Sequence, residues 1–249
     1  MAFFKDKPSL ISAALAPAKT YRPPLPAAGT PAGRLARTYN RLGGLIDLLA
    51  SQNDLDPMAV LSVWYVESGG RDFTAGTPII RFENHKFFQF WGHDHAADFD
   101  KHFQFGGRAG IAGKSHQNHK FRAGSSGPFA TFHGNQSKEY EVLDFATNLA
   151  SREEACLSIS VGGPQIMGFN HDVCGYASAA QMFAAFAQDE RFHVLGFFDF
   201  VQSKGLLDDI RKKKWVAFGA HYNGDGPTYG PLLEKAFSNK SKLSQLTKA

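Results

Sequence analysis

The segment from Asp56 to Gly70 constrains the fold more than any other part of the sequence. Asp56-Pro57 is typical of a helix start, because aspartate accepts hydrogen bonds from the free amides of the first turn and proline fits the first helical position. Gly69-Gly70 supplies the left-handed residue with which many helices end. The sequence therefore predicts a short helix whose two ends are both defined.

Glu67 lies in the last turn of this predicted helix. It follows Val60 by seven residues, Val63 by four and Trp64 by three, so it shares their face. Because that face is apolar and should turn inward, desolvation raises the pKa of the carboxyl, and the negative end of the helix dipole acts in the same direction. Two interpretations stay open: an acid still protonated near neutral pH, or a carboxylate that bends out to water.

The rest of the chain is mainly helical in pattern, with a small β element, which predicts a mainly α (α+β) fold. Thr77–Glu83 resembles a short strand. Residues 92–135 are rich in Gly, His and Phe without clear periodicity, and such insertions usually bind something or cover a site. Apolar periodicity and capping boxes predict helices near residues 34–49, 142–149, 151–159, 178–186, 192–205, 215–221 and 228–237.

The first 31 residues differ in composition from the remainder of the chain. Prolines punctuate small residues there, which favours an extended linker or a docking tail, and residues 32–249 are expected to form one domain. The apolar stretch Leu10–Ala16 after Lys5 and Lys7 is at the short end for a secretion signal. We therefore expect synthesis in the cytoplasm without a cleaved signal.

Composition excludes several classes of protein. Hydrophobic residues make up 43% and charged residues 20%, an ordinary globular balance, and no stretch approaches the roughly 18 apolar residues of a membrane span. The net charge of +4 suits acidic partners such as cell-wall polymers, but Arg211–Lys214 is the one compact basic run, and we interpret it as a solvated helix face rather than a nucleic-acid site. Cys156 and Cys174 are too few for a disulfide scaffold, and they either pair or stay reduced.

Three ordered motifs resemble the lysozyme-like superfamily, which includes goose-type lysozymes and soluble lytic transglycosylases. They are Glu67-Ser68, the Gly-rich turn Gly162–Gly168, and His221–Gly224 at a helix end. A narrower resemblance, to the N-acetylmuramidase family of phage endolysins and bacterial cell-wall-degrading effectors, covers roughly residues 35–238. The segments that carry it are Glu67–Arg71, Ile80–His85 and Gln165–His171 with Cys174-Gly175.

The resemblance implies a lysozyme-like domain that cleaves the β-1,4 bond between N-acetylmuramic acid and N-acetylglucosamine. Such a reaction needs an acid that protonates the leaving oxygen, a role that fits Glu67, and usually a second carboxylate. Glu83 is the candidate for the second carboxylate, with Asp72 behind it, although a structural ion pair of Glu83 with Arg81 or His85 is an equal alternative. The residues expected to line the sugar cleft are Gln165, Met167, Tyr222 and Asn223.

Other functions are weighed beside this one. A lytic transglycosylase would use Glu67 alone and form 1,6-anhydro products, and a glycan-binding or phage-tail module would retain the cleft without catalysis. The pairs His93/His95 and His116/His119 lack a recognised zinc spacing, so we expect no metal and no cofactor. The expected partner is peptidoglycan in the periplasm or cell wall of a target or host bacterium, reached through a phage or secretion carrier, with an immunity protein as a further partner of an injected effector.

Overall fold

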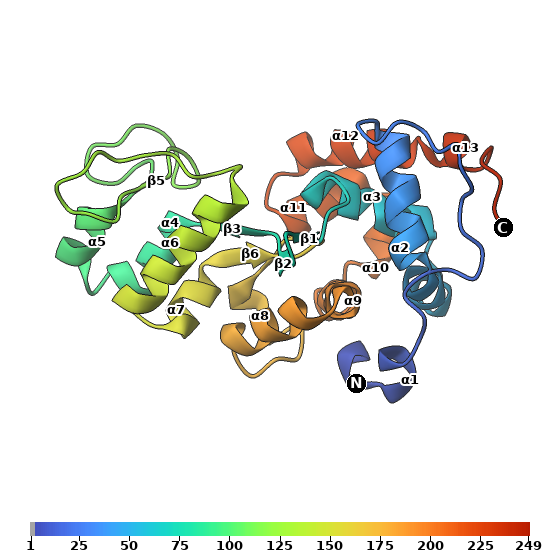
Figure 1. Ribbon diagram of the computed structural model, residues 1–249, viewed down its shortest axis with the longest axis horizontal. Helices are drawn as coiled ribbons and strands as arrows, with labels where there is room; N and C mark the ends of the chain where they lie inside the picture. The colour runs from blue at the N-terminus through green and yellow to red at the C-terminus, as the bar shows by residue number, and fades with distance from the viewer. Residues whose placement is uncertain (1–2) are drawn as a thin grey trace.

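A computed structural model describes residues 3–249 (Figure 1). Helices dominate and the strands are short, which confirms the mainly α (α+β) class. The α-helices are α1 (Pro8–Ile11), α2 (Pro31–Gln52), α3 (Pro57–Ser68), α4 (Asn84–Phe87), α5 (Ala96–His102), α6 (Gln136–Leu149), α7 (Arg152–Leu157), α8 (Ala179–Gln188), α9 (Glu190–Ser203), α10 (Leu207–Arg211), α11 (Trp215–Tyr222), α12 (Gly226–Phe237) and α13 (Lys240–Leu243). The 3₁₀-helical turns are η1 (Phe4–Asp6) and η3 (Gly168–Asn170), and η2 (Phe88–Gly92) is a π-helical turn.

Helix α3 begins and ends where the sequence predicts. The Asp56 side chain accepts a hydrogen bond from the Met58 amide at 3.0 Å, and Gly69 caps the other end with φ +66°. Trp64 is fully buried on this helix, and α3 packs against α2 and α12. The helix that carries Glu67 is thus held on two sides, and its last turn has a fixed position.

Short antiparallel strands form a hub in the middle of the molecule. The strand β3 (Ile80–Phe82) pairs with β6 (Ile159–Val161), which pairs in turn with β7 (Ile166–Met167). The other pairs are β1 (Phe73–Thr74) with β2 (Thr77–Pro78), and β4 (Phe103–Gln104) with β5 (Lys120–Phe121). The predicted strand over residues 77–83 is therefore split into β2 and β3, and the start of β3 lies beside the turn between β6 and β7, because Ile80 pairs with Val161.

The leader packs against the domain, unlike the extended linker that its prolines favour. Phe4 and Leu10 are buried in the main core, and both Asp199 carboxylate oxygens accept backbone amides of Phe4 and Lys5. Gly44 makes room for the chain, because a Cβ at this position would lie 2.3 Å from the Ala16 carbonyl oxygen. Long-range contacts that no local pattern reveals thus order residues 3–31, and the domain boundary at residue 32 stays a prediction.

The insertion after β3 folds around aromatic side chains and forms the region at the left of Figure 1. Phe87, Phe99 and Phe103 are fully or almost fully buried and contact one another. The buried Asn84 amide donates to the carbonyl oxygens of Gln104 and Lys120, each at 2.8 Å, which ties both arms of the insertion to the end of β3. Aromatic packing therefore replaces regular secondary structure here.

Two further expectations concern the membrane and the cysteines. Within residues 3–249, no helix is both long and apolar enough to span a bilayer. Cys156 and Cys174 are both free and buried, and burial raises the pKa of the Cys156 thiol to about 11. Of the two states left open by the sequence, the structure has the reduced one.

Candidate active site

One cleft brings together the site residues expected from the sequence. Its cavity measures about 680 Å³ and lies between the end of α3, the end of β3, the β6–β7 turn and the end of α11. Its lining includes Glu67, Glu83, Gln165, Met167, Tyr222 and Asn223. Four segments that are distant in sequence thus meet at one surface, with a carboxyl group on each of two walls.

The Glu67 side chain is half-buried in the lining of the cleft. Burial raises its pKa to about 8, and a hydrogen bond that the Tyr229 hydroxyl donates to Oε1 opposes part of this shift. Desolvation disfavours the charged carboxylate, and the position at the carboxyl end of α3 adds to this. Of the two interpretations of Glu67, the environment supports the acid that is still protonated at neutral pH.

Tyr229 is a site residue that sequence reasoning missed. It lies on α12, 162 positions from Glu67, and no motif or spacing connects the two. Tyr222, which the motif suggested, instead donates its hydroxyl hydrogen to the Pro164 carbonyl oxygen at 2.7 Å. The two tyrosine rings stack with centroids 6.4 Å apart, so Tyr222 supports both the turn before Gln165 and the tyrosine that binds Glu67.

Gln165 fixes the turn between β6 and β7. Its backbone is left-handed, with φ +50°, which is strained for a residue other than glycine. The side-chain amide donates to the Gly162 carbonyl oxygen at 2.8 Å and accepts from the Ser160 hydroxyl at 2.8 Å. These bonds hold the strained turn in place, and the residue lines the cleft at the same time.

The prediction that Asp72 is the reserve candidate for the second carboxylate is wrong. It is 1% exposed, accepts from the Trp64 indole nitrogen, and pairs with Arg41. Within residues 3–249, the cleft lining does not include it. Gly163 passes so close that a Cβ there would lie 2.1 Å from an Asp72 oxygen. Asp72 therefore fastens the turn to α2 and α3, and it does not face the substrate.

Glu83 lines the cleft, and one oxygen of its carboxylate is held in an ion pair. Oε1 accepts from Arg81 Nε at 2.6 Å, so the ion pair proposed as an alternative is present. Oε2 is buried and lies 3.4 Å from His119 Nδ1 and 3.5 Å from His85 Nδ1, without a hydrogen bond within residues 3–249. Ligand atoms of Glu83, His119 and His133 lie within 4.8 Å of one another, an arrangement suited to a metal ion. Burial lowers the pKa of His119 to about 4.

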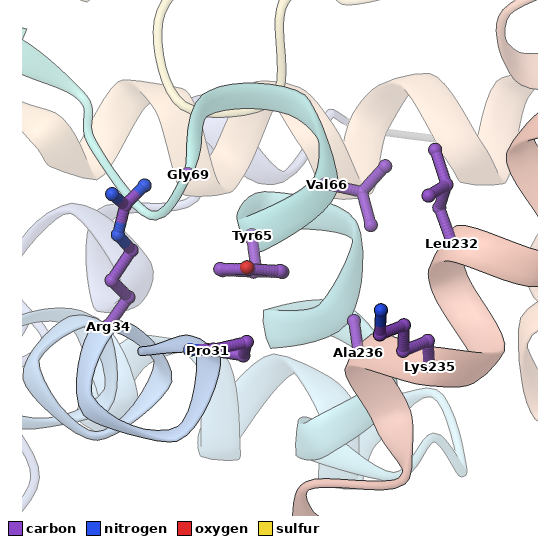
Figure 2. A pocket seen from close by; sticks show the side chains of 8 residues that line it. All are labelled: Pro31, Arg34, Tyr65, Val66, Gly69, Leu232, Lys235 and Ala236. Carbon is purple, nitrogen blue, oxygen red and sulfur yellow. The ribbon is translucent and has the colours of Figure 1, made fainter. Parts of the chain in front are cut away.

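A second cavity, of about 340 Å³, lies between α2, α3 and α12 (Figure 2). The Tyr65 ring stands at its centre, with Arg34 on one side and Leu232 and Lys235 on the other. Tyr65 and Glu67 are two residues apart and so point to nearly opposite sides of the helix. Among residues 3–249, those that line this cavity include no carboxyl group, so they offer no acid for glycoside chemistry.

Comparisons with known proteins agree with this geometry. The family model described as N-acetylmuramidase matches residues 56–238, and the chain belongs to this family of peptidoglycan hydrolases. The crystal structure of the endolysin of Burkholderia phage AP3 is similar, with a TM-score of 0.58 and 26% sequence identity over 79% of this chain and 70% of that one. No curated protein matches the chain. The protein is thus a muramidase with an endolysin-like fold, as the sequence motifs indicated.

Proposed function

We propose that the chain hydrolyses the β-1,4 bond between N-acetylmuramic acid and N-acetylglucosamine, with Glu67 as the general acid. The observation that carries the proposal is a carboxyl group in the cleft whose pKa is raised to about 8. At neutral pH such a group holds a proton that it can give to the leaving oxygen while positive charge builds at the sugar carbon.

Tyr229 determines which oxygen of Glu67 carries the proton. A protonated carboxyl has one oxygen that accepts hydrogen bonds and one that donates. Because the Tyr229 hydroxyl donates to Oε1, the proton resides on Oε2, and Oε2 is the atom that meets the glycosidic oxygen. Tyr229 is thus a positioning residue, and it also keeps Glu67 from rotating away.

Glu83 is the proposed second carboxylate, placed on the opposite wall. Its Oε1, held by Arg81, either activates the attacking water or stabilises the positive charge on the sugar. Arg81 and Lys204 add positive charge to the cleft lining, which suits the carboxylates of peptidoglycan. Gln165, Met167, Tyr222 and Asn223 would line the sugar subsites, and the Asn223 side chain also accepts the Asp225 amide at 3.0 Å.

A lytic transglycosylase is the second candidate, and the Arg81–Glu83 ion pair favours it. A carboxylate held by a guanidinium is a weaker base, and this reaction dispenses with it because the sugar's own hydroxyl replaces water. Mass spectrometry of the released muropeptides distinguishes the two reactions, since the anhydro product lacks one water.

We propose that the protein acts on the bacterial cell wall and that it reaches the cell wall during phage lysis. The similarity to a phage endolysin supports release through a lysis system. Injection into a neighbouring cell, with an immunity protein in the producer, is the alternative that co-purification from the native host would reveal.

The test is Glu67→Gln in the purified chain, assayed on peptidoglycan for released fragments. Glutamine keeps the size and the hydrogen bond from Tyr229 but has no acidic proton. We expect activity to fall by roughly 10²–10⁴-fold, the usual contribution of a general acid. Tyr65→Phe on the far side of α3 serves as the matched control. Lysis by Glu67→Gln at the wild-type rate would rule out the proposal.

A further inference from the structure

A cluster of metal-ligating side chains lies behind the cleft wall. Glu83 follows β3, while His119 and His133 come from the insertion, just before β5 and shortly before α6. His119 Nδ1 lies 3.4 Å from Glu83 Oε2 and 3.0 Å from His133 Nε2. The His119 side chain is fully buried, and Glu83 Oε2 is shielded from solvent. Three segments thus aim one ligand atom each at a common point.

The other nitrogen of each histidine is already engaged. His119 Nε2 lies 2.9 Å from the Ser115 carbonyl oxygen, and His133 Nδ1 lies 2.9 Å from Glu139 Oε1. A carbonyl or carboxylate oxygen only accepts, so these nitrogens carry the hydrogen and the inward nitrogens of the neutral rings carry lone pairs. Backbone carbonyls and carboxylates hold metal-ligating histidines in the same way.

Lone pairs that converge at such short distances repel one another unless a cation lies between them. Tetrahedral zinc with bonds near 2.0–2.1 Å separates its ligand atoms by about 3.3 Å. The separations of 3.4 Å and 3.0 Å are close to this value. His85 Nδ1 lies 3.5 Å from the same Glu83 oxygen, beside the group of three, and it makes no hydrogen bond within residues 3–249.

We propose that Glu83, His119 and His133 bind one Zn²⁺ ion, with His85 as the fourth ligand. The ion fastens the insertion to the end of β3 and so fixes the wall of the cleft that faces Glu67. It uses Oε2 of Glu83 and leaves Oε1, held by Arg81, for the reaction. The site is structural, because four protein ligands leave no open position for substrate. The proposal departs from the sequence-based expectation of no metal, which considered only histidines close in sequence.

The experiment measures binding of zinc chloride alone to the full-length chain after treatment with a chelator and dialysis. Isothermal titration calorimetry is expected to give one Zn²⁺ per chain, and the ion is expected to raise the unfolding temperature. His133→Ala should weaken binding by at least 100-fold and abolish the rise in unfolding temperature. His93→Ala, in the same insertion with a side chain that is 79% exposed, should retain both.

A proton shared by His119 and His133 is the competing occupant. It predicts no saturable zinc binding by the wild type, or equal binding by wild type and His133→Ala, and either result overturns the proposal. Should His133→Ala fail to fold, His133→Gln retains a side chain that can donate to Glu139, and circular dichroism confirms its fold. Binding is read without an activity assay, so the result is independent of the role of Glu67.

Discussion

The two walls of the cleft place a carboxyl group in opposite environments. On the wall formed by the ends of α3 and α11, burial of Glu67 favours the neutral acid, and the hydrogen bond from the Tyr229 hydroxyl opposes part of this effect. On the wall formed by β3 and the insertion, one oxygen of Glu83 pairs with the Arg81 guanidinium and the other lies beside two imidazoles. In Figure 1 these walls belong to the right and left parts of the molecule, joined by β3 and β6. Chemically identical groups acquire different roles from their surroundings alone.

The largest expected effect is a loss of activity when either carboxyl group is replaced, and the loss should differ between Glu67 and Glu83. Glu67→Gln is expected to lose roughly 10²–10⁴-fold, because the proton donor disappears in either reaction. Glu83→Gln should lose at least tenfold if water is activated there, since a neutral amide is not a base. Rates of fragment release from purified peptidoglycan provide the measurement. Equal and small losses in both variants would contradict the division of roles.

Replacing Asp72, the buried carboxylate beside the β6–β7 turn, should lower the stability of the fold. Asp72→Ala leaves the buried Trp64 indole nitrogen without its partner and removes one of the two carboxylates that Arg41 binds. Breaking a buried pair on one side typically costs about 3 kcal/mol in the free energy of unfolding. Urea denaturation measures it, and Asp94→Ala on the exposed surface of the insertion is the control. A change below about 0.5 kcal/mol would show that Asp72 does not hold the turn.

A smaller effect on activity is expected from Tyr229→Phe, which removes the hydrogen bond to Glu67. The tyrosine hydrogen bond lowers the pKa of Glu67, so its loss should move that pKa above about 8. The basic limb of the profile of kcat/KM against pH should shift to higher pH, with a loss of a few fold in kcat. A variant that only disturbed packing would lower the rate without moving the limb.

A separate effect concerns the dependence of stability on pH. The pKa of Glu67 rises from 4.5 to about 8 on folding, so its contribution is complete below pH 4.5 and is lost as the pH rises through about 8. Wild type should therefore lose unfolding temperature between pH 5 and pH 8 relative to Glu67→Gln, while the two should coincide near pH 4. Differential scanning calorimetry at both ends measures this. A constant offset between the two proteins would contradict the raised pKa.

Local signals account for what the sequence could predict. The caps at Asp56, Ser151 and Ser178 and the helix end at Gly69 each involve residues within a few positions of one another, and each of the three cap side chains accepts a hydrogen bond from the first turn. The ordered motifs likewise indicated six residues that line one cleft.

Contacts between distant segments could not be predicted in this way. Tyr229 meets Glu67 only because α12 packs on α3, and the leader is held by distant groups such as the Asp199 carboxylate, which accepts its amides. The choice between Glu83 and Asp72 also needed the fold, because both come soon after Glu67 in the sequence. Only the path of the chain shows that one faces the cleft and the other Trp64.

The most direct measurement is a titration of the Glu67 carboxyl carbon by nuclear magnetic resonance in the free chain, assigned by its absence in Glu67→Gln. The account predicts an apparent pKa near 8. An ordinary value near 4.5 would mean that the group is charged at neutral pH and has no proton to give to the glycosidic oxygen.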